Sequence, residues 1–308
     1  MSRQALDIFA SELDATVLQA IDIGARSGVE KRLATLTQDY EDPDALRRLA
    51  GQLRQHSLDH LDEHLAGAER RLEENGAQVH FAATTARALE IVLDIVRASG
   101  TRVVTKSKSM ASEELDLSRE LASRGFEPLE TDLGEFVVQL DDDHPSHIVK
   151  PIIHKTRHDV ARSFERSGLG DYNDDPETIT RRARSFMRDK FLAAGVTITG
   201  ANFVSAESGR VVVVTNEGNA RFGQAGADVH IVLAGIEKVI PRDRDLALLL
   251  SLLIRSATGQ RITSYVELIG GPRHSAQPSG PRSISRCRRR FARSECWSPT
   301  MIARCGAI

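Results

Sequence analysis

Apolar residues recur at helical spacing through the first 76 residues. Leu46, Leu49, Leu53, Leu58 and Leu61 illustrate this period, with charged residues between them. Neighbours on one face of an α-helix are three or four positions apart. The pattern closes on a glycine, a residue suited to the end of a helix. Residues 1–76 are therefore predicted to form a helical N-terminal region.

From residue 77 onward, short β-branched runs alternate with helical stretches. The predicted strands are 79–82, 102–105, 126–129, 136–140, 148–153, 196–198, 210–215, 229–233 and 262–269. The predicted helices are 84–99, 112–124, 175–195 and 242–254. Such alternation indicates a parallel sheet covered by helices, so residues 77–272 are predicted to form an α/β domain. The run Val211–Val214 predicts a strand buried on both faces.

Residues 273–308 lose all periodicity. They hold all three Cys, the only Trp, and eight Arg against one acidic residue, Glu295. A charged, disordered extension is one interpretation, because such tails are common. The other is a reading frame that departs from the native one near Pro272, since Arg, Ser, Pro, Cys and Trp rise together while Lys, Asp and Val vanish. We favour the second, a disordered and out-of-frame tail.

Charge and hydropathy narrow the class of protein. The chain has 41 basic and 43 acidic residues, and because eight of the basic residues lie in the tail, the remainder is acidic. An acidic body argues against nucleic acid as a partner, since nonspecific affinity for phosphate backbones comes from basic groups. The N-terminus lacks the apolar stretch of a secretory signal. The longest apolar run, Leu246–Ile254, is shorter than the roughly 18 residues of a membrane span. We expect no membrane span and a cytoplasmic location.

Metal and cofactor motifs are missing from the sequence. Cys287, Cys296 and Cys305 are nine positions apart and lack the C-x-x-C pairing that clamps zinc or an iron–sulfur cluster. Four histidines gather between positions 144 and 158, without the Glu of the H-E-x-x-H zinc motif. Motifs for dinucleotides, P-loop phosphates and serine hydrolases are absent as well. We therefore expect no metal ligands and no cofactor in this chain.

A first candidate binding segment follows the strand predicted at 102–105. Lys106, Lys108 and Ser109 lie between that strand and the next helix. In open α/β sheets, ligands bind beyond the carboxyl ends of strands, and a helix N-terminus offers free N–H groups to an anion. These residues can therefore hold a phosphate or a carboxylate. The alternative is a solvated turn in which Ser112 only caps the helix.

A second group of candidates surrounds the strand predicted at 210–215. Glycine permits close approach of the backbone, Asn bridges donors and acceptors, and Glu supplies a carboxylate. The candidates of this group are Thr199, Gly200, Asn202, Glu207, Glu217 and Asn219. Ordinary turn chemistry is the alternative, since Asn-Glu-Gly-Asn and Glu-Ser-Gly are common turn formers.

A third pair, Glu237 and Lys238, follows the strand predicted at 229–233. An exposed ion pair between the two, which would contribute little to stability, is the alternative to a binding role. If the loops after neighbouring strands meet at one edge of the sheet, the lysines would face an anionic small molecule. Asn202, Asn219 and Glu217 would orient that molecule by hydrogen bonds.

Seven strings in order resemble those of LUD-domain lactate-utilization proteins of the iron–sulfur cluster-binding type. They are VVTKSKSM at 103–110, ETDLGE at 130–135, PSHIVKP at 145–151, ITGANF at 198–203, VTNEGN at 214–219, GIEK at 235–238 and RSATGQ at 255–260. The resemblance runs from about Gln78 to Pro272. It implies a NagB/RpiA/CoA-transferase-like α/β fold and a role in a complex that oxidises L-lactate to pyruvate. Other lactate-utilization subunits and a small anionic metabolite are the implied partners.

The family also implies 4Fe-4S clusters for electron transfer, held by C-x-x-C-x-x-C-x-x-x-C-P runs after the LUD domain. This chain departs from that pattern after residue 273, so we expect a chain truncated before its ferredoxin-like module. A component of an L-lactate dehydrogenase-type oxidoreductase complex is the first functional hypothesis. The alternative is an enzyme domain that binds a small anion or a CoA metabolite, with Glu207 or Glu217 as nucleophile or base. No catalytic residue is assigned.

Overall fold

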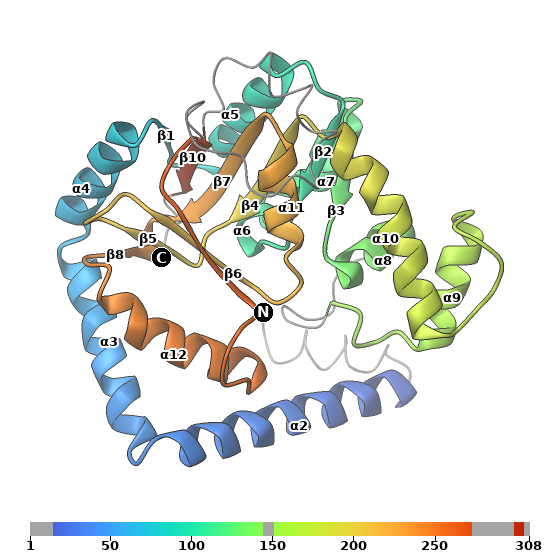
Figure 1. The fold of residues 1–308 in the computed structure, drawn as a ribbon, viewed down its shortest axis with the longest axis horizontal. Coiled ribbons are helices and arrows are strands. Elements are labelled where there is room, and N and C mark those ends of the chain that lie inside the picture. The colour runs from blue at the N-terminus through green and yellow to red at the C-terminus, as the bar shows by residue number, and fades with distance from the viewer. Residues whose placement is uncertain (1–14, 144–150, 273–298, 305–308) are drawn as a thin grey trace, which may run out of the picture. The chain divides into compact units, whose positions relative to one another are not determined.

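The computed structural model describes residues 15–143, 151–272 and 299–304 (Figure 1). Contacts divide the chain into two compact units, and each is discontinuous in sequence. Unit 1 comprises residues 1–47, 133–186 and 250–262, and unit 2 comprises 48–132, 187–249 and 263–308. These units are not the same as the predicted segments 1–76 and 77–272.

Unit 2 contains a six-stranded parallel sheet in the order β1-β10-β7-β4-β2-β3 (Figure 1). Its strands are β1 (Gln78–Ala82), β2 (Val103–Lys106), β3 (Glu127–Glu130), β4 (Val196–Gly200), β7 (Val229–Gly235) and β10 (Pro299–Arg304). Parallel strands need crossover connections, which the helices between them supply. The α/β class predicted from the alternating pattern is confirmed.

Three helices of this unit cover one face of the sheet. They are α5 (Thr85–Ala98), α6 (Met110–Glu113) and α7 (Leu117–Ser123). The hydroxyl of Thr84 accepts the N–H of Arg87, which caps the start of α5. The apolar stripe of α5 includes Val92 and Val96, both fully buried. This stripe packs with apolar residues of β2, β4 and β7 in one core.

A second sheet, in the order β8-β5-β6-β9, belongs to the same unit. Its strands are β5 (Phe203–Ser205), β6 (Val211–Thr215), β8 (Val239–Ile240) and β9 (Tyr265–Ile269). Apolar residues of β5, β6 and β8 form another core with α4 (Leu61–Glu74) and with Val232 and Ala234 of β7. Helix α11 (Asn219–Gly226) packs against β2 and β4. The burial predicted for Val211–Val214 holds for the first three residues.

Unit 1 is helical. It contains α2 (Ala15–Asp39), α8 (Leu133–Leu140) and α9 (Arg157–Arg166), and it shares α3 (Pro43–Asp59), α10 (Pro176–Ala193) and α12 (Asp245–Thr258) with unit 2. Phe136, Phe164 and Phe186 form its aromatic core, with ring centroids 6.1 and 5.5 Å from that of Phe136. Arg255 binds Asp39 at 2.8 Å within the same unit.

The predicted strand at 136–140 is wrong, because these residues belong to helix α8. Phe136, Val137 and Val138 are all buried, and a short run that is apolar on every side gives no period that separates helix from strand. The strand predicted at 148–153 is wrong for its described part, since Pro151–Ile153 form turns. The helix predicted at 112–124 is broken in two by Asp116, whose φ of 46° is left-handed.

Strand β10 was not predicted from the sequence. Residues 299–304 of the tail pair with β1 on one side and β7 on the other, with Thr300 opposite both Gln78 and Ile231. For these six residues a strand replaces the disorder that the composition indicated. The predictions for 273–298 and 305–308 lie outside the described residues, and the out-of-frame origin of the tail stays a prediction.

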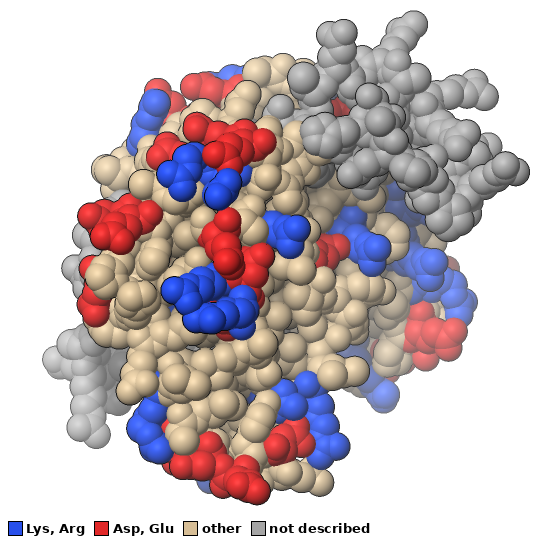
Figure 2. All heavy atoms as spheres, turned by 60° about the vertical axis from the view of Figure 1, so that its left-hand side comes forward, with Lys and Arg blue, Asp and Glu red and all other residues tan. Residues whose placement is uncertain are grey.

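On the face drawn in Figure 2, Lys and Arg side chains lie among Asp and Glu side chains. Several ion pairs of the described residues join side chains of one helix, as Arg71 and Glu74 of α4 do at 2.7 Å. Exposed pairs of this kind contribute little to stability. Within the described ranges, every helix is too short or too polar to cross a membrane.

Candidate functional site

The loops after β2, β4 and β7 share one edge of the six-stranded sheet. Strand β4 lies between the other two, with Lys106 opposite Ile198 and Gly200 opposite Leu233. The N–H of Ser107 donates to the carbonyl of Ile198 at 2.9 Å. Helix α6, which follows the first loop, packs against both β4 and β7. The segments predicted at these three strand ends therefore do lie at one edge.

Lys106 is the last residue of β2, and its side chain is buried. Its ammonium group lies 2.6 Å from a carboxylate oxygen of Glu113 and 3.0 Å from one of Glu130. Ser118 donates to the same oxygen of Glu130 at 2.5 Å. The sequence predicts that Lys106 faces an anionic ligand, whereas in the structure its ammonium group contacts two carboxylates of the protein itself. An ammonium group neutralised in this way is a poor binder of a further anion.

Ser109 lies against the backbone of Gly200. Its hydroxyl accepts the N–H of Ser112 and thereby caps the short helix α6, so the cap is Ser109 and not Ser112, which the alternative interpretation of this segment gave as the cap. A Cβ added at Gly200 would lie 2.8 Å from the hydroxyl oxygen of Ser109. Ser109 is buried and Lys108 is half-buried. Only a glycine at position 200 permits this close approach of the two loops.

Thr199 and His230 form a buried polar pair beneath this edge. Thr199 Oγ1 lies 2.8 Å from Nε2 of His230, which comes from β7. Burial lowers the pKa of His230 to about 3, so its imidazole is neutral near pH 7. A second buried pair of hydroxyls, Thr105 and Thr197, lies 3.1 Å apart in the neighbouring strands. Hydroxyls and a neutral imidazole make the interior of the sheet polar without adding charge.

Asn202, Glu217 and Asn219 shape the second sheet and the loop after β6. The side-chain oxygen of Asn202 accepts the N–H of Val214 at 2.8 Å. The hydroxyl of Thr215 donates to Glu217 at 3.2 Å and to Asn219 at 3.1 Å. These bonds are the turn chemistry that was the alternative to a binding role. Whether these three residues also bind a ligand stays a prediction.

Glu207, Glu237 and Lys238 are engaged in local contacts. A carboxylate oxygen of Glu207 accepts the N–H of Asp243 at 2.8 Å. Lys238 lies 3.3 Å from Glu237, and both side chains are exposed, so the ion pair considered as the alternative is present. The carbonyl of Glu237 accepts a bond from Arg54 of α3.

The candidates that gather at the sheet edge are therefore Lys108, Ser109 and Gly200, with Thr199 directly beneath. Glu113, Glu130 and His230 set the electrostatics of this edge, and none of them was predicted from the sequence. Glu130 opens one of the strings that carry the resemblance, and this was the available signal. The pairing of His230 with Thr199 required the register of two strands.

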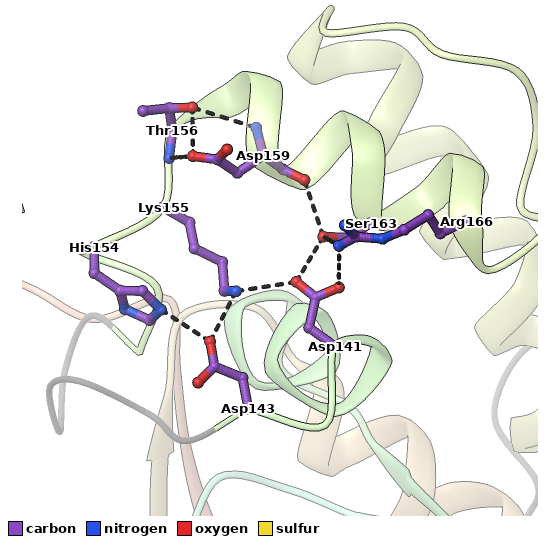
Figure 3. A network of polar contacts seen from close by, with 8 residues as sticks. All are labelled: Asp141, Asp143, His154, Lys155, Thr156, Asp159, Ser163 and Arg166. Carbon is purple, nitrogen blue, oxygen red and sulfur yellow. Dashed lines mark hydrogen bonds and ion pairs between the residues drawn. The ribbon is translucent and has the colours of Figure 1, made fainter.

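Unit 1 contains a separate polar network between the end of α8 and the start of α9 (Figure 3). Lys155 lies 3.0 Å from Asp141 and 2.8 Å from Asp143. Burial alone would raise the pKa of Asp141, but bonds from Ser163, Lys155 and Arg166 outweigh burial and lower it. Through Asp141, the network connects the end of α8 to Ser163 and Arg166 of α9.

The histidines of the segment 144–158 do not gather where the structure describes them. His154 lies 3.2 Å from Asp143 in this network. His158 contacts the hydroxyl of Tyr172 at 2.7 Å instead. His144 and His147 lie outside the described residues.

The amino-acid sequence of this chain is similar to those of known proteins. Residues 65–285 match the LUD domain family, which extends the similarity past Pro272. A lactate utilization protein B of Shouchella clausii (strain KSM-K16) is 40% identical over 265 residues, which cover 84% of this chain and 56% of that protein. The uncharacterized electron transport protein YkgF of Escherichia coli (strain K12) is 39% identical over 267 residues, covering 85% and 56%. The chain thus spans just over half the length of these relatives.

Among solved structures, a DUF162 family protein of Deinococcus radiodurans is similar, with a TM-score of 0.40 and 11% sequence identity. The similarity covers 80% of this chain and 98% of that one.

Proposed function

We propose that this chain, which belongs to the LUD domain family, takes part in lactate utilization. We also propose that it binds a small carboxylate at the sheet edge formed by the loops after β2, β4 and β7. The observation that carries the binding site is the contact between Ser109 and Gly200, which joins two of these loops. Lactate and pyruvate are carboxylates of the size that a few converging polar groups recognise.

Lys108 is the cation that we assign to this site. Lys108 follows the last residue of β2 by two positions, in the loop at this edge, and its side chain is half-buried. A half-buried ammonium group binds a carboxylate more strongly than an exposed one, because solvent screens it less. Ser109 next to it supplies a hydroxyl at the same strand end.

The finer part of the proposal is a role in the oxidation of L-lactate to pyruvate, as one component among other lactate-utilization subunits. This reaction releases two electrons and two protons, so another component has to accept the electrons. The electron transport protein named above supports that context. We propose no enzymatic residue in this chain.

Iron–sulfur clusters do not fit the donor set of this chain. A 4Fe-4S cluster takes four suitably spaced thiolates. The sequence has three Cys, at 287, 296 and 305, and all lie outside the described residues. Electron transfer through such clusters would therefore require thiolates from elsewhere.

Calorimetric titration of the chain with L-lactate, pyruvate, inorganic phosphate and CoA tests the site. We expect a carboxylate to bind and Lys108→Ala to weaken it about tenfold or more, because a hydrogen bond to a charged group contributes roughly 1.5–3 kcal/mol. Lys190→Ala is the matched control, since Lys190 pairs with Glu127 at the opposite end of β3. Equal affinity in the parent and Lys108→Ala would exclude the site. Binding of CoA alone would favour the second function, a CoA-metabolite-binding domain.

A further inference from the structure

Three histidines form a compact triangle where α3 ends and α4 begins, a junction seen at the left of Figure 1. The ring centroids of His56 and His60 are 4.6 Å apart, those of His56 and His64 5.8 Å, and those of His60 and His64 6.3 Å. All three residues belong to unit 2. Their regular spacing of four residues is visible in the sequence, but none of the motifs described above includes them.

The backbone at His60 explains how three residues this far apart in sequence form one triangle. The N–H groups of His60 and His64 donate to the carbonyls four residues earlier, at 3.2 and 3.1 Å, so all three side chains project from one side. In a straight helix, His56 and His64 would be separated by about 12 Å along the axis. His60 departs from helical geometry, with φ of −120° and ψ of 33°. The resulting bend accounts for the short distance between the outer two rings.

The dimensions of the triangle match those of a metal centre with three imidazole ligands. Bonds from zinc to imidazole nitrogen of about 2.0–2.1 Å and near-tetrahedral angles place the ring centroids about 5 Å apart. The observed separations of 4.6–6.3 Å bracket that value. The rings are inclined to one another by 60–69°, so ring edges can face a common point.

Capture of an ion requires a small adjustment. The ligand nitrogens of the three rings do not all lie within 4.8 Å of one another in the described structure. His56 and His60 are exposed, so their rings can rotate at little cost. His64 is half-buried and fixes the third corner of the triangle.

The environment of His64 favours a cation. Its Nε2 atom is buried and has no hydrogen-bond partner within the part of the chain that the structure describes. A buried nitrogen without a partner costs free energy that a metal bond would recover. Burial, followed by His56 and His60, lowers the pKa of His64, while the carboxylates of Glu63 and Asp62 act on it in the opposite direction. Those two carboxylates also attract a positive ion.

We propose that His56, His60 and His64 bind one first-row transition metal ion, with zinc as the reference ion and solvent in the remaining position. Imidazole ligands suit Zn²⁺, Cu²⁺ and Ni²⁺, and a solvent-facing site with three protein ligands retains an open position. The ion would link the end of α3 to the start of α4. This site is separate from the proposed carboxylate site at the sheet edge.

Equilibrium dialysis with Zn²⁺ alone, and titration with Co²⁺ followed by its visible absorbance, test this site. We expect one equivalent of metal to bind. We expect His60→Gln to weaken metal binding by more than roughly tenfold, since even the loss of a residue that only hydrogen-bonds a metal ligand lowers metal affinity about tenfold. The double variant His154→Gln/His158→Gln is the matched control, because it removes two histidines with the same spacing. It should bind the ion as the parent does.

Thiolates are the main competitors for the metal, so the measurements are made with the three Cys replaced by Ser. Circular dichroism establishes that each variant is folded. A parent chain that binds no stoichiometric Zn²⁺ or Co²⁺ would overturn the proposal. A His60→Gln variant with unchanged metal affinity would also overturn the proposal. The same holds if the control variant, and not His60→Gln, loses metal binding.

Discussion

Lys106 and Glu130 form an ion pair of 3.0 Å in which the two side chains are only 1% and 7% exposed. The pair joins the end of β2 to the end of β3, and Glu113 of α6 completes it from the next helix. Taking these charges out of water costs several kcal/mol per ion, which is recovered only while the geometry is maintained. Lys106 therefore positions the loop that carries Lys108 and Ser109.

Replacing Lys106 tests this positioning role. We expect Lys106→Met to lower the free energy of unfolding by about 3–5 kcal/mol, because it leaves Glu130 buried without its cation. Urea denaturation followed by circular dichroism measures the change. If Lys106 served only a bound ligand, the ligand-free variant would be as stable as the parent.

The double variant Lys106→Met/Glu130→Gln is the control for this prediction. It removes both buried charges, so it should recover much of the lost stability. If the double variant lost as much free energy of unfolding as the two single variants lose together, the two side chains would not be coupled as an ion pair.

Gly223 and Gly51 predict opposite responses to alanine. A Cβ at Gly223 would lie 2.2 Å from the hydroxyl oxygen of Thr197, so α11 would be pushed off the sheet. We expect Gly223→Ala to destabilise the protein by about 1–3 kcal/mol. Gly51 lies inside α3 with open space around it, so Gly51→Ala should stabilise by about 0.5–1 kcal/mol. Thermal melting of both variants decides whether α11 packs as described.

The sequence predicted every strand of the parallel sheet except β10, because each of the other short apolar runs is bounded by turn residues. The run before Lys106 and the run after Ala194 became β2 and β4, and their loops meet as expected. The role of Lys106 could not be predicted in this way. Its partners Glu113 and Glu130 lie on other elements, and only the folded chain brings them together.

The errors have physical causes as well. The run at 136–140 opens with three consecutive apolar residues and is short, so its length and composition fit a buried strand as well as the helix that packs Phe136 on Phe164. Strands β5 and β8 are only three and two residues long, too short to produce a period. Turn formers such as Asn202 and Asn219 carry the same sequence signal whether they bind a ligand or the backbone.

Truncation tests strand β10. Because β10 lies between β1 and β7, a chain that ends at Ser298 should have a lower melting temperature, as two neighbouring strands lose their hydrogen-bond partner. A chain that ends at Arg304 retains the whole strand and is the control. An unchanged melting temperature at Ser298 would instead support the tail as an out-of-frame addition.

His230 predicts a dependence of stability on pH that one variant can isolate. Its pKa in the folded chain is about 3 because of burial, against an ordinary value of 6.5. Below pH 6.5 the unfolded chain therefore takes up a proton that the folded chain does not. The stabilising contribution is complete above pH 6.5 and is lost as the pH falls toward 3.

We expect this single group to reduce the free energy of unfolding by about 2 kcal/mol between pH 7 and pH 5. Carboxylates with ordinary pKa values remain largely ionised over this range, so they add little to the change. Urea denaturation of the parent and of His230→Gln at pH 7, 6 and 5 measures it, because Gln does not titrate and every other histidine is common to both chains. The difference in stability between the two chains should shrink steadily as the pH is lowered. If the free energies of unfolding of the two chains changed in parallel with pH, His230 would be accessible to protons in the folded chain. That result would contradict the burial of His230 beside Thr199.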